Sequence, residues 1–148
     1  MSELKAKLLD DIKIAMKSGA KERLATLRLM SSDIKQVEVD TRVVLDDAAI
    51  LSIFEKMLKK RRDSITQFGA ANRQDLVDKE QAEVLVIQDY MPAQLSDAEI
   101  DVAIASAISA TGASTGKDMG KVIAILKAKI AGKADMQVLS ARVKAKLN

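Results

Sequence analysis

The chain of 148 residues contains neither cysteine nor histidine. Without these side chains it has no thiol nucleophile, no disulfide, no imidazole base and no cysteine- or histidine-based zinc site. It has no tryptophan, one tyrosine and two phenylalanines, so few aromatic faces are available to stack on unpaired bases. Six glycines and one proline also disfavour a turn-rich β-protein.

Long apolar runs are absent too. No stretch approaches the roughly 18 consecutive apolar residues of a membrane span, and acids interrupt the first apolar pattern at Glu3, Asp10 and Asp11. A secretory signal needs an uninterrupted apolar region and a transit peptide avoids acids, so we expect neither. We therefore expect a cytoplasmic protein without a membrane partner, and the lack of cysteine is compatible with a reducing compartment.

Apolar residues recur at helical spacing along almost the whole chain, a pattern that predicts seven helices. Four lie before Pro92, which disfavours helical geometry in the residue before it. Ser96 and Glu99 then form a capping box that starts the fifth helix. We predict an all-α protein with a four-helix N-terminal subdomain, residues 1–92, and a three-helix basic C-terminal subdomain, residues 93–148.

The excess of positive charge lies at the C-terminal end of the chain. Residues 1–92 hold 16 basic and 16 acidic side chains, whereas residues 93–111 hold three acids and no base. Residues 112–148 hold eight bases and two acids, a net charge of +6. A terminal segment of this kind suits a polyanion, but lysines that only solvate a small helical surface give the same pattern.

Glycines accompany the lysines of this basic segment. Gly116 and Gly120 are four residues apart, with Lys117, Lys121 and Lys133 nearby. Exposed backbone amides at the first turns of the sixth and seventh helices would form a phosphate cradle at the positive ends of the helix dipoles. Helix capping and tight helix packing are the alternative explanation, and for any single glycine they are favoured.

Residues 112–118 are similar in composition to a phosphate-binding P-loop but depart from its pattern. Thr111 stands where the first glycine belongs, Asp118 replaces the serine or threonine that holds magnesium, and no strand precedes the segment. We therefore expect no nucleotide there.

The remaining charged motifs predict no catalytic centre. Residues 59–62 are all basic, but they fan around a helix beside Glu55 and Asp63, which is typical of a solvated face. Glu80 and Glu83 share a helix face without a partner nucleophile, so we interpret them as surface charge. The sequence thus predicts no catalytic residue, no metal site and no cofactor.

An ordered set of short stretches spans nearly the full chain. They are residues 21–24, 27–29, 61–64, 67–68, 73–77, 80, 90–92, 94–96, 111–114, 117–122 and 132–135. In that order they resemble the GatB/YqeY family, specifically its stand-alone YqeY-like members.

The resemblance implies an all-helical protein of two subdomains, related to the C-terminal tail of the B subunit of the glutamine-dependent Asp/Glu-tRNA amidotransferase. In that enzyme the tail grips tRNA, while a separate body carries out the chemistry. The activity name carbon–nitrogen ligase with glutamine as amido-N-donor would therefore reach this chain only through its relationship to the amidotransferase, and not through an active site of its own. The resemblance implies RNA contacts at Lys117, Gly120, Lys121, Gly132, Lys133 and Asp135, and we add Lys129 and Arg142 from the basic segment as candidates.

We therefore expect a non-catalytic tRNA-binding protein that is accessory to tRNA-dependent amidation, with a tRNA amidotransferase or aminoacyl-tRNA synthetase complex as a further partner and no DNA. A protein-interaction module that docks on another subunit or on itself is the alternative, which the neutral first subdomain and the methionines favour. A self-sufficient amidotransferase would need a nucleophile, a metal site or a nucleotide loop, and the sequence offers none.

Overall fold

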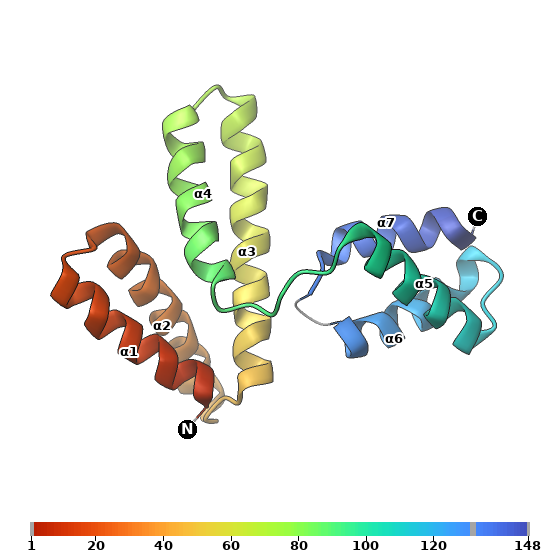
Figure 1. Cartoon of the computed structure of the whole chain (residues 1–148), viewed down its shortest axis with the longest axis horizontal. Coiled ribbons are helices and arrows are strands. Elements are labelled where there is room, and N and C mark those ends of the chain that lie inside the picture. Colours follow the sequence, from red (N-terminus) through yellow and green to blue (C-terminus); the bar gives the residue numbers. More distant parts are fainter. Residues whose placement is uncertain (1, 131–132, 148) are drawn as a thin grey trace. The chain divides into compact units, whose positions relative to one another are not determined.

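The computed structural model describes residues 2–130 and 133–147 and shows an all-α protein (Figure 1). Helices, with the short 3₁₀ turn included, make up 82% of the described residues, and these residues contain no strand, so the predicted fold class and the seven α-helices are confirmed. The elements are α1 (Glu3–Ser18), α2 (Lys21–Thr41), α3 (Asp47–Ala70), α4 (Gln74–Gln88), α5 (Asp97–Thr111), a short 3₁₀ turn η1 (Gly116–Asp118), α6 (Met119–Ile130) and α7 (Met136–Leu147). They form two compact units, unit 1 (Met1–Met91) and unit 2 (Pro92–Asn148).

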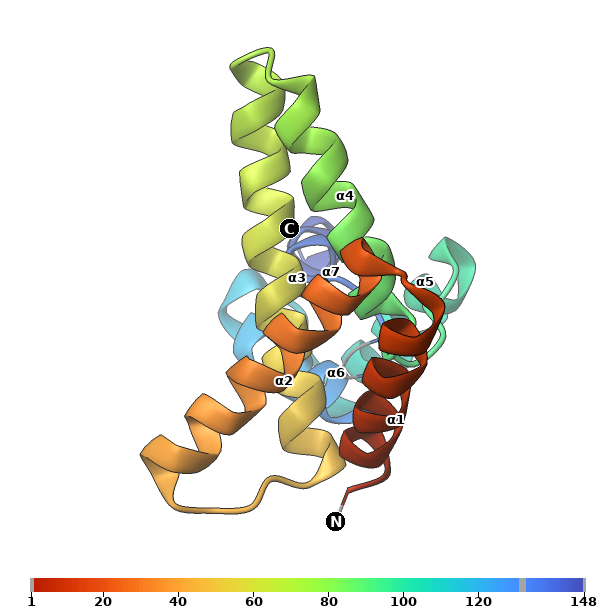
Figure 2. The ribbon, with the colours of Figure 1, turned by 90° about the vertical axis from the view of Figure 1, so that its left-hand side faces the viewer.

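Unit 1 consists of two helical hairpins that share one core. α1 packs against α2, α3 packs against α4, and α2 also contacts α4 (Figure 2). The side chains of Leu8, Leu27, Met30, Phe54 and Ile87 are completely or almost completely buried between them. Burial of this apolar surface is the main source of stability for the unit.

Local sequence signals set the ends of these helices. Gly19 has a φ of 72° and closes α1 in a left-handed conformation that favours glycine. The Asp46 side chain accepts a hydrogen bond from the Ala49 amide at 2.9 Å and caps α3. The next carboxylate, Asp47, accepts from the Leu4 amide at 3.2 Å. The two acids thus start α3 and fasten α1 to it.

Tyr90, just after α4, joins three helices of unit 1. Its hydroxyl donates a hydrogen bond to Asp11, its ring meets the Phe54 ring edge-on at 5.9 Å, and the Lys7 ammonium lies 4.5 Å from the ring centroid. Burial, followed by the hydrogen bond to Asp11, raises the pKa of the Tyr90 phenol above its ordinary value. The phenol is therefore a structural hydrogen-bond donor.

An ion pair between α3 and α4 corrects the interpretation of Glu83 as surface charge. Arg61 Nε donates to Glu83 Oε2 at 2.9 Å, and the two side chains are only 12% and 15% exposed. Arg61 also donates to the Met57 carbonyl at 3.2 Å. The basic run at residues 59–62 is therefore divided, because one of its members points inward and is neutralised.

Unit 2 is a three-helix module with a core of its own. Ile104 on α5, Val122 and Leu126 on α6, and Leu139 and Val143 on α7 are all fully buried. α6 contacts both α5 and α7, and it runs in the opposite direction to α7 (Figure 1). The amphipathic pattern of each helix therefore directs its apolar stripe to one shared centre.

Hydrogen bonds and one glycine set the ends of the helices in unit 2. The Ser96 hydroxyl accepts from the Glu99 amide at 3.2 Å, and Glu99 Oε1 accepts from the Ser96 amide at 3.1 Å, which confirms the capping box. Gly112 closes α5 with a φ of 66°. The Leu95 amide donates to the Lys133 carbonyl at 2.8 Å, so the connection between α6 and α7 is tied to the segment before α5.

Candidate nucleic-acid interface

Two of the predicted lysines lie at the N-terminal end of α6. Lys117 belongs to η1 and Lys121 to the first turn of α6, and both are exposed. Their spacing of four residues places them on the same side, away from the buried Val122. Gly120 between them is also exposed, and a Cβ added there would meet no atom within 4 Å. The backbone beside the two ammonium groups is therefore open to solvent.

This position is electrostatically unfavourable for lysines in the free protein. A helix dipole carries its positive end at the N-terminus, so cations are favoured at the other end. Asp118 gives partial compensation, because the amides of Ser114 and Thr115 and, to a lesser degree, Lys121 lower the pKa of its carboxyl and keep it ionised. An anionic ligand over Lys117 and Lys121 would remove the remaining repulsion.

The structure corrects the expected cradle of free backbone amides at the start of α7. Asp118 Oδ2 accepts hydrogen bonds from the Ser114 amide at 3.1 Å and the Thr115 amide at 3.4 Å. At the start of α7, Asp135 Oδ1 accepts from the Gln137 amide at 2.8 Å. At α7 a carboxylate of the chain itself therefore occupies a first-turn amide that was expected to face a phosphate, whereas Asp118 holds amides of the loop before η1.

The other predicted site residues lie in positions that differ from those of Lys117 and Lys121. Lys129 is exposed in the last turn of α6, and Lys133 is half-buried in the turn that follows. Asp135 is the N-terminal cap of α7, and Gly132 lies outside the described residues. Lys129 and Lys133 thus stay near the C-terminal end of α6, and Lys129 is about two helical turns away from Lys121.

Arg142 is held by the acidic helix of its own unit. Its guanidinium contacts Asp97 Oδ1 at 2.8 Å and Asp101 Oδ1 at 3.1 Å, and it also donates to the Asp97 carbonyl at 3.5 Å. These bonds join α7 to the start of α5. Arg142 therefore stabilises the three-helix module, and its charge is largely neutralised before any ligand arrives.

Three further lysines were missed in the residue-by-residue prediction. Lys127, Lys144 and Lys146 are exposed, and all three lie in the last turn of a helix, where cations are favoured. A repeated sequence pattern, apolar–Lys–Ala–Lys–apolar, at residues 126–130 and 143–147 could have identified these lysines as exposed side chains. In both copies the apolar residues are buried and the lysines stay outside.

Unit 2 carries seven lysines at its surface, at both ends of α6 and in the last turn of α7: Lys117, Lys121, Lys127, Lys129, Lys133, Lys144 and Lys146. We call this set of side chains the lysine surface. Within the described part of the chain, none of the seven has a carboxylate within 4.0 Å of its ammonium nitrogen. Because α6 and α7 are antiparallel, the last turn of α7 with Lys144 and Lys146 lies at the same end of the pair as Lys117 and Lys121.

Neither a metal-ligand cluster nor a membrane-spanning helix is found among the described residues. No group of three or more acidic side chains could hold a metal ion among residues 2–130 and 133–147. No helix in that part of the chain is long and apolar enough to cross a membrane. The fold and the lysine surface together define a two-unit, all-helical protein with a basic three-helix module.

That class agrees with the comparison against known families. The family model described as Yqey-like protein matches residues 5–147, and the chain belongs to the YqeY family. The resemblance inferred from the sequence stretches is thereby confirmed.

Several fungal proteins are similar over much of the chain. A relative named "Altered inheritance of mitochondria protein 41, mitochondrial" from Pyrenophora tritici-repentis is 34% identical over 127 residues, which cover 82% of this chain and 70% of the relative. The protein of the same name from Lachancea thermotolerans is 36% identical over 108 residues, 70% of this chain and 57% of the relative. An uncharacterized protein of Schizosaccharomyces pombe is 32% identical over 94 residues, 64% of this chain and 73% of the relative.

These relatives overturn the expectation of a cytoplasmic location, because their names assign them to mitochondria. The expectation used the lack of cysteine and the acids near the N-terminus, and neither property of a helical domain specifies a compartment. The chain spans little more than half of the length of the Lachancea relative.

Proposed function

We propose that the chain binds tRNA through the lysine surface of unit 2 and has no catalytic activity of its own. The observation that carries the proposal is the placement of Lys117 and Lys121. Both are exposed at the positive end of α6, and among the described residues neither has a carboxylate within 4.0 Å of its ammonium nitrogen. Helix stability does not account for cations at this end, whereas a bound phosphate does.

The composition of the surface limits how RNA can be recognised. Lysines contribute point charges to phosphates, and the described residues of unit 2 contain no aromatic side chain that could stack on a base. The bound form is therefore structured RNA, read by backbone shape and charge. An accessory role in tRNA-dependent amidation fits this mode, because such a protein would hold tRNA while another enzyme performs the transfer.

A salt titration of tRNA affinity tests the proposal. The logarithm of the binding constant should fall linearly with the logarithm of salt concentration, since each neutralised phosphate releases counterions. Replacing both lysines (Lys117→Ala with Lys121→Ala) should weaken binding and flatten the slope by up to about 2 units if each contacts a phosphate. Fluorescence anisotropy of end-labelled tRNA gives both quantities.

The matched control is Lys13→Ala with Lys17→Ala, because this pair has the same spacing and is also exposed, but lies on α1 of unit 1. The control should keep the wild-type slope. Binding that is insensitive to salt, or a slope that falls equally in both double variants, contradicts the proposal. Arg142→Ala should leave the slope unchanged, because Asp97 and Asp101 already neutralise that guanidinium.

A further inference from the structure

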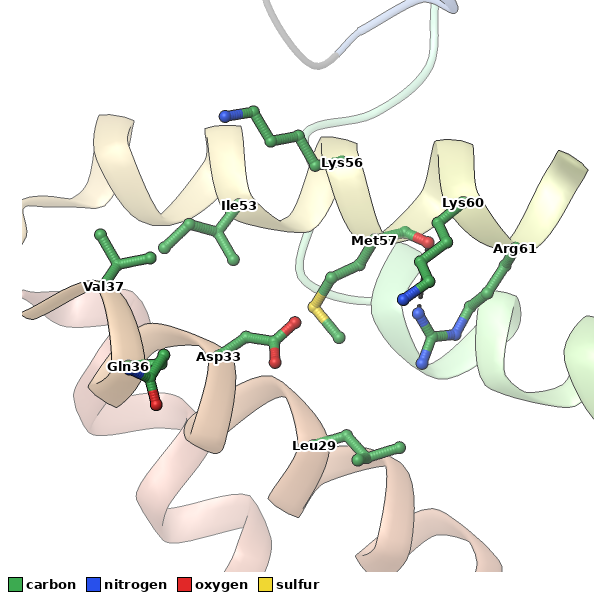
Figure 3. A pocket seen from close by; sticks show the side chains of 9 residues that line it. All are labelled: Leu29, Asp33, Gln36, Val37, Ile53, Lys56, Met57, Lys60 and Arg61. Carbon is green, nitrogen blue, oxygen red and sulfur yellow. Dashed lines mark hydrogen bonds between the residues drawn. The ribbon is translucent and has the colours of Figure 1, made fainter. Parts of the chain in front are cut away.

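Unit 1 contains an open groove between α2 and α3 that no internal element fills. It has a volume of about 430 Å³ and is lined by Leu29, Asp33, Gln36, Val37, Ile53, Lys56, Met57, Lys60 and Arg61. We call it the α2–α3 groove (Figure 3). Figure 3 shows Val37 beside Ile53 at one end, and Leu29 opposite Lys60 and Arg61 at the other, where the two helices diverge.

The floor of the groove is apolar and continuous with the core of unit 1. Met57 is 5% exposed and belongs to that core, and Val37 and Ile53 pack against it. Leu29 is 46% exposed although it faces the same groove. An apolar partner surface would cover Leu29 and extend the core, which is favourable in proportion to the area removed from water.

The two walls of the groove differ in charge. On α3, Lys56 and Lys60 are exposed, four residues apart and without a carboxylate within 4.0 Å in the described structure. Arg61 closes this wall, but Glu83 neutralises it. On α2 the wall carries the single acid Asp33, whose carboxylate points across the groove toward Met57 (Figure 3). The unpaired cations are therefore confined to one side of an apolar floor.

We propose that the α2–α3 groove binds an amphipathic helix of a partner protein, with acidic residues along the flank that faces Lys56 and Lys60. The apolar positions from Leu29 to Val37 extend over about 12 Å of helix, which matches an apolar stripe of two to three turns. Acids four residues apart on such a helix would lie opposite the two lysines. This inference concerns unit 1 and does not depend on RNA binding by unit 2.

Two synthetic peptides of about 18 residues test the charge preference. Both carry the same leucine stripe at helical spacing, with either glutamates or lysines along one flank. The wild-type chain should bind the glutamate peptide at least about tenfold more tightly than the lysine peptide in a fluorescence anisotropy titration, since two favourable ion pairs are replaced by two repulsive ones. A difference below threefold overturns the proposal.

Charge reversal then locates the site. Lys56→Glu with Lys60→Glu should invert the preference in favour of the lysine peptide, and Leu29→Gln should weaken both peptides. The control, Lys13→Glu with Lys59→Glu, changes two exposed lysines outside the groove and should keep the wild-type preference. All the replaced side chains are at least partly exposed, so circular dichroism should show folded variants.

Three results would overturn the inference. The first is that neither peptide binds at 100-fold molar excess, and the second is that the charge-reversed variant keeps the wild-type preference. The third is that the wild-type chain is a dimer by sedimentation velocity and becomes monomeric with Leu29→Gln, because the groove would then be filled by a second copy of the chain.

Discussion

The separate core of unit 2 predicts that one substitution can unfold this unit alone. Leu126 is completely buried there, and the buried residues of the two units form two distinct clusters. Leu126→Ala removes buried apolar contacts and leaves a cavity, at a cost of about 2–5 kcal/mol. A domain of this size has a total stability of roughly 3–8 kcal/mol, so the loss removes most of what holds unit 2 together.

Hydrogen–deuterium exchange followed by mass spectrometry is the assay. Peptides from α5, α6 and α7 should lose most of their protection in the Leu126→Ala variant, whereas peptides from α1 to α4 should exchange as in the wild type. Val138→Ala is the matched control, since Val138 is on α7 but 43% exposed. Equal loss of protection in both units, or full protection of α6, would refute independent cores.

Two other substitutions test specific contacts. Tyr90→Phe should lower the free energy of unfolding by about 1–2 kcal/mol at pH 8, because it removes the hydrogen bond to Asp11. Because the pKa of Tyr90 is raised in the folded state, the unfolded chain loses the phenolic proton first as the pH rises above 10. The stabilisation by Tyr90 therefore declines, and the free energies of unfolding of the wild type and the variant converge by about 1.4 kcal/mol per pH unit. Urea denaturation at pH 9 and pH 11 measures the difference, and a gap that does not change with pH would contradict the assignment. Ser96→Ala removes the cap of α5 and should destabilise unit 2 by about 1 kcal/mol in thermal unfolding, with no effect on the melting of unit 1.

Local signals in the sequence were sufficient to predict the helices. Apolar spacing, the capping box at Ser96 and Glu99, and the left-handed position at Gly112 depend on neighbours within four residues along the chain. The structure reproduces these features because tertiary packing does not oppose them.

Charge pairing could not be predicted in the same way. Arg61 binds Glu83, 22 positions away, and Arg142 binds Asp97, 45 positions away. Both pairs form because helices that are distant in sequence pack side by side, whereas the sequence interpretation considered partners within one helix turn. The same limit explains why Arg142 was named as a candidate RNA contact, although Asp97 and Asp101 bind it. The groove between α2 and α3 was also invisible in the sequence, because it depends on how two helices diverge.

Protection of individual lysines by tRNA tests the central claim most directly. The chain would be acetylated briefly with and without excess tRNA, and the modification of each lysine quantified by mass spectrometry. The account predicts that Lys117 and Lys121 become protected, while Lys13 and Lys17 on α1 react at the same rate in both samples. Equal reactivity of Lys117 and Lys121 with and without tRNA, under conditions where tRNA is bound, would contradict it.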